Sequence, residues 1–352
     1  MLYIDIKKQL GDFTLDIRIE TNKETLALFG ASGCGKTVTL KCIAGIEKPD
    51  EGEIVLGDKT LFSSKKKINL PPQKRNVGLL FQSYALFPNM TLEENIAVSI
   101  PKNCPNKDKI IKEKIKEFSL EGLENNYPHE LSGGQQQRTA LARMLVNEPE
   151  ILMLDEPFSA LDEHLRWKLE QKLIDTLHNY GKTALYVSHN KDEVYRIADK
   201  IAIYNHGKIQ SIGDKQEIFN RPGNVDAAKL IGCNNISKAR KIGRNRIYAI
   251  DWGLELESEE MVQDDLKYIG IYGSNLDISN GMVPENTFPM KIINRIENPF
   301  SSTLVLRHER GVDTSYKSHI YLEINSKKSP DEIYLDEPVY VHFKKEKLLL
   351  LY

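Results

Sequence analysis

The chain has 352 residues, of which 40% are hydrophobic and 28% charged, and its 48 basic and 50 acidic residues leave a net charge of −2. This composition is typical of globular proteins, and the length suggests two or three domains. The balanced charge argues against a global nucleic-acid-binding surface. The four cysteines have neither metal-ligand spacing nor a dense disulfide framework, which fits a reducing compartment.

The N-terminus is predicted to be a β-hairpin, because residues 2–19 alternate in hydrophobicity on either side of a turn at Gly11 and Asp12. It carries no apolar signal segment. No stretch approaches the roughly 20 apolar residues that a membrane-spanning helix needs. We therefore expect any role at a membrane to depend on a partner protein.

A phosphate-binding loop is predicted where the apolar strand of residues 26–29 ends. Glycines let successive backbone N–H groups face one anion, and the helix predicted over residues 38–43 adds the positive end of its dipole. The pattern predicts triphosphate binding, with Lys36 at the β- and γ-phosphates and the Thr37 hydroxyl on magnesium. The loop reads Gly30-Ala31-Ser32-Gly33-Cys34-Gly35-Lys36-Thr37 and matches G-x-x-x-x-G-K-[ST].

Gln82 follows a strand predicted over residues 77–81, at the sheet edge where ligands bind in open α/β folds. The residues after it, among them Tyr84 and Phe87, form an apolar and aromatic surface ahead of a helix that is capped by Thr91. This surface is either local core or a docking surface for a partner.

A second phosphate-seeking helix terminus is predicted at Ser132-Gly133-Gly134-Gln135, after an amphipathic helix over residues 107–118. Ser132 suits an N-cap, and the two glycines leave the backbone of the helix start bare. One nucleotide cannot easily use both sites within one globule. A head-to-tail dimer, in which the second site caps the nucleotide of the other copy, is the economical solution.

Two carboxylates, Asp155 and Glu156, follow the apolar strand of residues 151–154. Asp155 suits magnesium, directly or through a bound water. Glu156 suits a general base that orients and deprotonates an attacking water. His189 ends the next buried strand, predicted over residues 183–189, and is either structural or a hydrogen-bond partner of the γ-phosphate and that water.

Together these motifs make residues 1–233 closely resemble the ATP-binding subunit of ABC transporters. The resemblance implies an α/β P-loop NTPase fold, with a mixed sheet and a helical subdomain at about residues 92–148. It implies that ATP and Mg²⁺ are bound, with Glu156 and His189 catalytic and the other roles as follows. Residues 30–37 and Gln82 bind ATP. Members of the family stack an aromatic residue near the N-terminal turn on adenine; here either Phe13 takes that role or Leu10 replaces the stack with a weaker apolar contact. Thr37, Gln82 and Asp155 bind Mg²⁺; Ser132, Gly133, Gly134 and Gln135 reach the partner's ATP; Asp162 belongs to the D-loop; Tyr84 and Phe87 contact the permease.

The partners implied by this resemblance are a second copy of the chain, transmembrane permease subunits and, indirectly, an extracytoplasmic solute-binding protein, with no nucleic acid. The expected place is the cytoplasmic side of the cell (inner) membrane, where the chain is peripheral. A regulatory ABC ATPase acting on nucleic acid or ribosomes is the alternative, which tandem cassettes or a long charged arm would favour. A P-loop kinase would lack the Ser132–Gln135 motif.

Residues 234–352 contain short alternating stretches separated by turns, which predict a small all-β, OB-like barrel. This region resembles the transport-associated (TOBE) domain of the molybdate, sulfate, iron and sugar importers. The segments around Cys233 and Trp252 look most like the molybdate and sulfate importers. The expected function is therefore ATP hydrolysis that drives import of molybdate or a similar oxyanion, with iron(III), sugar or polyamine import as alternatives.

Overall fold

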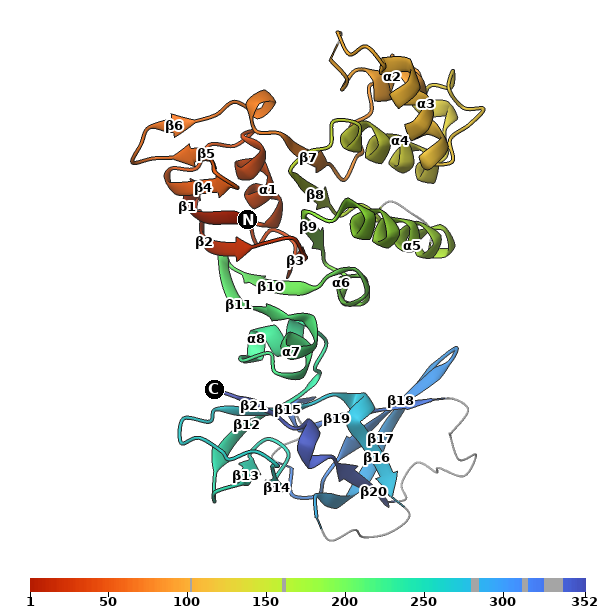
Figure 1. Ribbon diagram of the computed structural model, residues 1–352. Coiled ribbons are helices and arrows are strands. Elements are labelled where there is room, and N and C mark those ends of the chain that lie inside the picture. Colours follow the sequence, from red (N-terminus) through yellow and green to blue (C-terminus); the bar gives the residue numbers. More distant parts are fainter. Residues whose placement is uncertain (102, 160–162, 280–284, 312–315, 326–337) are drawn as a thin grey trace. The chain divides into compact units, whose positions relative to one another are not determined.

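The computed structural model describes the chain except for residues 102, 160–162, 280–284, 312–315 and 326–337 (Figure 1). Contacts divide the chain into two compact units, Met1–Lys215 and Gln216–Tyr352. The boundary between functional domains that the sequence places after residue 233 stays a prediction. Each unit has its own hydrophobic core.

The first unit begins with an antiparallel sheet in the order β2-β1-β4-β5-β6. The predicted hairpin forms its start, because β1 and β2 pair along their whole length, from Leu2 opposite Thr21 to Leu10 opposite Phe13. The strands are β1 (Leu2–Leu10), β2 (Phe13–Thr21), β4 (Glu51–Leu56), β5 (Lys59–Ser63) and β6 (Ile68–Asn69).

The second sheet of this unit has the order β11-β10-β3-β9-β8-β7. From β10 to β7 all neighbours are parallel, and only the edge strand β11 is antiparallel. Every residue of β3, β8 and β9 is buried, as expected for parallel strands with both faces covered. The strands are β3 (Thr25–Gly30), β7 (Val77–Leu80), β8 (Ile151–Asp155), β9 (Thr183–Ser188), β10 (Lys200–Asn205) and β11 (Lys208–Asp214).

The helices of the first unit connect these strands. Figure 1 shows α2, α3 and α4 together as a helical subdomain on the far side of β7 from α1. Among the described residues, no helix is both long enough and apolar enough to cross a membrane. The helices are α1 (Lys36–Ala44), α2 (Leu92–Ala97), α3 (Lys107–Glu117), α4 (Gly133–Leu145), α5 (Glu163–Tyr180) and α6 (Lys191–Ile197), with short 3-10 turns at Pro72–Lys74 and Pro128–Glu130.

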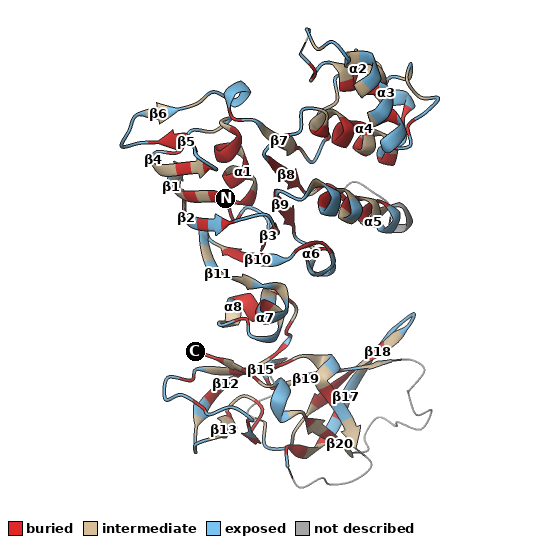
Figure 2. Cartoon of the chain, viewed as in Figure 1, coloured by how far each residue is buried: buried red, intermediate tan, exposed pale blue. Residues whose placement is uncertain are grey.

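The second unit is β-rich, as predicted, and its described strands form two five-stranded antiparallel sheets that share one core. Along several of these strands, for example Asn235–Lys241 and Leu254–Glu257, buried residues alternate with more exposed ones (Figure 2). The helices are α7 (Lys215–Asn220) and α8 (Val225–Leu230). One sheet holds β12 (Asn235–Lys241), β13 (Arg246–Ala249), β14 (Leu254–Glu257), β15 (Tyr268–Ile271) and β21 (Leu349–Leu351); the other holds β16 (Leu276–Ser279), β17 (Thr287–Asn298), β18 (Ser301–Arg307), β19 (Ile320–Asn325) and β20 (Pro338–Phe343).

Candidate nucleotide-binding site

The predicted site residues gather at one edge of the parallel sheet. The carboxyl ends of β3, β7, β8 and β9 meet there because these strands are adjacent and parallel. The loop after β3, Gln82 after β7, Asp155 at the end of β8 and His189 after β9 therefore lie on the same side. This edge is where ligands bind in open α/β sheets.

The loop from Gly30 to Lys36 has a backbone that only glycine tolerates at its turns. Gly33 and Gly35 have φ values of 78° and 108°. A Cβ on Gly35 would lie 2.7 Å from Leu15 Cδ1, closer than real Cβ contacts, and 3.1 Å from Phe13 Cζ, tighter than most of them. The first turn of α1 has no side-chain cap and no acidic residue, so its N–H groups are available to an anion.

Lys36 is folded over this loop. Its ammonium donates to the carbonyl oxygens of Gly30 at 2.8 Å and Ala31 at 2.9 Å, and the residue is only 5% exposed. A positive charge is therefore held against two backbone carbonyls of the loop, beside the start of α1. The charge, the uncapped helix start and the glycine turns fit a triphosphate.

A hydroxyl and a carboxylate meet next to the loop. Thr37 Oγ1 donates to Asp155 Oδ1 at 3.1 Å. Burial raises the pKa of Asp155 above its usual value, and the hydrogen bond from Thr37 opposes that rise. Oxygen ligands of this kind suit Mg²⁺, and a cation there would compensate the buried charge of the carboxylate.

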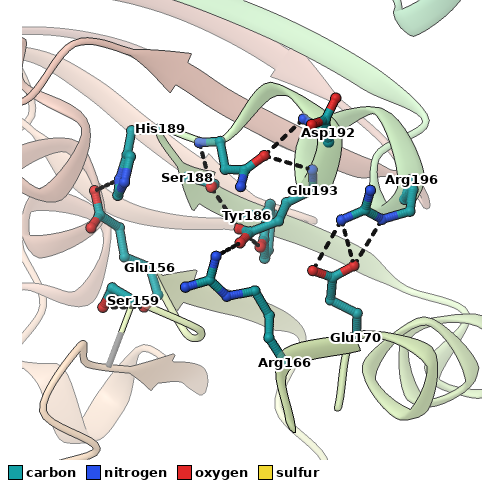
Figure 3. A network of polar contacts seen from close by, with 11 residues as sticks. Glu156, Ser159, Arg166, Glu170, Tyr186, Ser188, His189, Asp192, Glu193 and Arg196 are labelled. Carbon is teal, nitrogen blue, oxygen red and sulfur yellow. Dashed lines mark hydrogen bonds and ion pairs between the residues drawn. The ribbon is translucent and has the colours of Figure 1, made fainter. Parts of the chain in front are cut away.

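Glu156 and His189 are in direct contact. Glu156 has an unusual φ of 45°, and its N–H donates to the carbonyl of Val187 at 3.0 Å. Its Oε1 lies 3.1 Å from Nδ1 of His189 (Figure 3). A non-glycine residue in this conformation is held there by its surroundings, which is common at functional sites.

A hydrogen-bonded chain links Gln82 to this pair. Gln82 Nε2 donates to Ser159 Oγ at 3.1 Å, and the Ser159 hydroxyl donates to the carbonyl oxygen of Glu156 at 3.0 Å. The sequence predicts functional roles for two residues of this region, Gln82 at the nucleotide and Asp162 in the D-loop. Asp162 lies outside the described residues, so its predicted place in the D-loop stays a prediction.

Ser132 caps α4 as the sequence predicts. Its Oγ accepts from the N–H of Gln135 at 3.4 Å, and Gln135 Oε1 accepts from the N–H of Ser132 at 2.7 Å. The capping residues belong to the subdomain that Figure 1 shows apart from α1. Ser132 and Gly133 are exposed, so the described surface leaves this terminus open to another molecule. Contact with a partner's ATP stays a prediction.

The two aromatic residues predicted to contact the permease are placed differently. Tyr84 is only 5% exposed, and its hydroxyl donates to the carbonyl of Pro157 at 3.3 Å. Phe87 is 44% exposed, and its ring lies 5.4 Å from the guanidinium carbon of Arg143. Of this pair, Phe87 therefore presents the exposed ring, while Tyr84 faces inward, as the local-core alternative requires.

Phe13, predicted to stack on adenine, is partly buried against the core of the first unit. Its Cζ atom lies 3.1 Å from the position of a Cβ on Gly35. The ring therefore borders the phosphate loop, and stacking on a base stays a prediction.

Ser159, the first residue of the predicted D-loop, and two residues that the sequence did not single out, Asn95 and Glu193, add further contacts in this region. Ser159 joins Gln82 to the backbone of Glu156. Asn95, fully buried, donates to the carbonyls of Phe87, Met90 and Thr91 and accepts from the N–H of Phe87. Glu193, only 5% exposed, accepts hydrogen bonds from Tyr186 and Ser188, both in the strand that precedes His189. A polar residue at an inward helix position is the signal that points to Asn95 and Glu193.

Comparisons with known proteins agree with this geometry. The sequence profile described as ABC transporter matches residues 14–159. The chain is 46% identical over 231 residues to "Spermidine/putrescine import ATP-binding protein PotA" of Acetivibrio thermocellus, a match that covers 64% of this chain and 63% of that protein. It is 39% identical over 290 residues to the protein of the same name from Clostridium novyi, with 79% and 81% covered.

The longest of these matches is to "Fe(3+) ions import ATP-binding protein FbpC" of Haemophilus influenzae, 36% identical over 333 residues, with 91% of this chain and 90% of that protein covered. A solved structure, "Dimeric structure of a post-hydrolysis state of the ATP-binding cassette MJ0796 bound to ADP and Pi", has a TM-score of 0.52 and 26% identity. It covers 61% of this chain and 99% of that one.

The parallel sheet, the glycine loop with Lys36 and the paired acidic residues after β8 define a P-loop ATP-binding cassette. The chain belongs to the ABC transporter family, among the ATP-binding proteins of import systems. The ATP-binding proteins of such systems are ATPases.

Proposed function

We propose that this chain hydrolyses ATP at the edge of its parallel sheet and so drives a polyamine importer. The observation that carries the proposal is that β3, β7, β8 and β9 bring the phosphate loop, Gln82, Asp155, Glu156 and His189 together. The loop and the start of α1 hold the triphosphate. Thr37, Asp155 and Gln82 would hold Mg²⁺, which would neutralise charge on the transferred phosphoryl group.

In the reaction, the carboxylate of Glu156 accepts a proton from water while the water oxygen bonds to the γ-phosphorus. The bond from the γ-phosphorus to the bridging oxygen breaks, which leaves ADP and inorganic phosphate. His189 donates a hydrogen bond to the γ-phosphate, and its contact with Glu156 at 3.1 Å supports a joint action of the two groups at one reacting atom. Lys36 neutralises charge at the β- and γ-phosphates.

The working form is a head-to-tail dimer in which residues 132–135 of one copy bind the nucleotide of the other. Two observations support it. The start of α4 is exposed and lies in a different part of the unit from the phosphate loop, and the solved cassettes similar to this chain are titled as dimers. Closure on ATP and reopening after hydrolysis then move the permease.

The proposed partners are permease subunits, contacted through Phe87, and a solute-binding protein that delivers the solute to them. The chain lies on the cytoplasmic face of the membrane in this assembly. Phe87 is held by Asn95 in a short loop before α2, and an exposed aromatic ring in a rigid loop is a suitable anchor for a partner.

The proposed solute is a polyamine of the spermidine and putrescine type, because the relatives from A. thermocellus and C. novyi carry that name. Iron(III) is the second candidate, since the H. influenzae match spans nearly the whole chain. Both solutes were alternatives in the sequence interpretation. The relatives named here do not favour molybdate, which was its first expectation.

Replacing Glu156 with Gln tests the hydrolytic mechanism. The amide keeps the size of the side chain and loses the base, so we expect ATP binding to persist, turnover to fall by about 100-fold or more, and the ATP-bound dimer to accumulate in size-exclusion chromatography. Equal turnover in the variant and the parent chain would remove Glu156 from the mechanism. If the Glu156→Gln chain stayed monomeric with Mg-ATP bound, the proposed head-to-tail dimer would be refuted.

The solute is tested by reconstituting the chain with its permease and binding protein in vesicles. Spermidine, putrescine, Fe(III) and molybdate are each supplied with the binding protein, and stimulation of ATP hydrolysis is measured. Stimulation by the polyamines alone supports the proposal. Stimulation by Fe(III) or molybdate instead would replace the proposed solute and leave the ATPase assignment in place.

A further inference from the structure

Helices α5 and α6 are connected by two ion pairs, and each helix supplies the arginine of one pair and the glutamate of the other (Figure 3). From α5 to α6, Arg166 Nη1 lies 3.7 Å from Glu193 Oε1. From α6 to α5, Arg196 donates through Nε at 2.8 Å and Nη2 at 3.1 Å to the carboxylate of Glu170. Glu193 and Glu170 are 5% and 1% exposed. Buried carboxylates of this kind depend on their partners to remain charged.

The second oxygen of Glu193 holds the end of β9. It accepts from Tyr186 Oη at 2.9 Å and from Ser188 Oγ at 2.8 Å. Ser188 Oγ in turn accepts from the N–H of Asn190 at 3.0 Å. The residues immediately before and after His189 are therefore both tied, directly or through one hydroxyl, to the carboxylate of Glu193.

The segment before helix α5 is bonded to the other partner of His189, Glu156. Ser159, four residues before α5, hydrogen bonds through its N–H and hydroxyl to the carbonyl of Glu156. Arg166 lies in the first turn of α5. Glu193 thus accepts contacts from β9, the strand before His189, and from Arg166 of α5, the helix after Glu156. It therefore connects the segment that carries His189 with the segment that carries Glu156.

We propose that Glu193 is a positioning residue that fixes the imidazole of His189 against Glu156, and that Arg166 anchors Glu193 from α5. The inference rests on the proposed function, in which Glu156 and His189 act on ATP. Glu193 itself is set back from the phosphate loop, behind β9, and touches neither nucleotide nor water in the reaction. Its effect is on the orientation of the imidazole.

The charge of Glu193 is needed because its environment supplies only donors. Tyr186, Ser188 and Arg166 all direct hydrogen atoms toward the carboxylate. An amide in its place has one oxygen to accept and an NH₂ group that opposes the remaining donors. Glu193→Gln therefore preserves the volume and forces at least one of these partners to turn away, which releases the backbone around His189.

The test compares Glu193→Gln with Asp192→Asn in the full-length chain. Asp192 is the neighbouring, exposed carboxylate in the same first turn of α6, so it controls for loss of charge at the helix N-terminus. We expect Glu193→Gln to lower kcat by about 10- to 100-fold, while the Kd for ATP, measured by equilibrium dialysis, stays within about twofold of the parent value. Asp192→Asn is expected to keep both.

Two further variants separate positioning from simple support of the fold. Arg166→Met should lower kcat by a smaller factor, and adding it to Glu193→Gln should cause little further loss, because both changes break the same contact. Glu193→Asp keeps the charge and should recover part of the kcat that Gln loses. A structural role alone would lower the melting temperature without changing kcat per folded molecule.

The outcomes are distinguishable from those of the proposed function. If Glu193→Gln matches Asp192→Asn in kcat while His189→Ala lowers turnover, the positioning role is wrong and the site assignment stands. If His189→Ala and Glu156→Gln both keep full turnover, the proposed function itself is wrong. Should Glu193→Gln not fold, Tyr186→Phe removes one donor and keeps the buried ring, and an unchanged kcat in that variant overturns the inference.

Discussion

Arg75 is a buried cation that joins the end of α1 to the loop before β7, and replacing it with Met tests how much this junction contributes to stability. The residue is 1% exposed, and burial lowers the pKa of its guanidinium below the usual value. It donates to the carbonyls of Cys42 and Ile43 at 2.8 and 2.9 Å, near the C-terminus of α1. It also donates to the carbonyl of Leu70 at 2.8 Å.

The magnitude follows from the groups left behind by Arg75→Met. Three backbone carbonyls and the side-chain oxygen of Asn69 lose a donor. The carbonyl of Cys42 keeps the N–H of Gly45 at 3.3 Å, and each buried acceptor left without a partner costs about 1–3 kcal/mol. Removing the guanidinium also removes the cost of burying a charge, which offsets part of this loss. We expect a net decrease of about 3 kcal/mol in the free energy of unfolding of the first unit.

The assay is urea unfolding of the full-length chain without nucleotide, followed by far-UV circular dichroism. The second unit provides an internal reference, because Trp252 is fully buried in its core and its fluorescence reports that unit. Trp167, the other of the two tryptophans, is 62% exposed and responds little. The transition of the first unit should move to lower urea, while that of Trp252 should stay.

Arg18→Met is the matched control. Arg18 is an exposed arginine of the same unit, with its guanidinium carbon 5.7 Å from the centre of the Tyr3 ring, and its loss should cost less than about 1 kcal/mol. If Arg75→Met shifts the first transition no more than Arg18→Met, the proposed contribution of the buried guanidinium is refuted.

Three more outcomes follow from single contacts. Gly35→Ala should abolish ATP binding in a filter assay, because its Cβ would lie 2.7 Å from Leu15 Cδ1 at a φ of 108°; retained affinity would contradict the steric reasoning. Asn95→Ala should release the loop that carries Phe87 and weaken co-purification with the permease, while ATP affinity in the isolated chain is retained; unchanged co-purification would contradict this role of the loop. Burial lowers the pKa of His308 below 6.5, so its neutral form stabilises the second unit above pH 6.5 and that contribution is lost as pH falls through the lower folded-state pKa. His308→Gln should therefore flatten the pH dependence of the tryptophan-monitored transition, and an identical dependence in both chains would contradict the assignment.

Much of the site could be predicted because each of its parts is a short contiguous motif at the end of a strand. The loop from Gly30 to Thr37 specifies its own backbone through glycine, and Asp155 and Glu156 follow directly on a buried apolar strand. The parallel order of β3, β9 and β8 then brings these segments to one edge. Local sequence therefore determined both the type of each group and the end of the strand from which it projects.

The solute was not determined in this way. The expectation of molybdate rests on a diffuse resemblance of the segments around Cys233 and Trp252. The named relatives favour polyamines or iron instead. A β-rich fold was predictable from alternating hydrophobicity, because period-two burial needs no long-range information. The chemistry of a transported ligand leaves no such periodic signal.

The sequence by itself determined the nucleotide chemistry and the fold class, since both are written in residues that are close together along the chain. Tertiary structure alone decided which aromatic ring is exposed, with Tyr84 turned inward and Phe87 outward. It also decided that Arg166, on a different helix, reaches the carboxylate of Glu193. The physical reason is that burial and ion pairing depend on which elements pack against one another, and that packing is set by contacts between residues distant in the sequence.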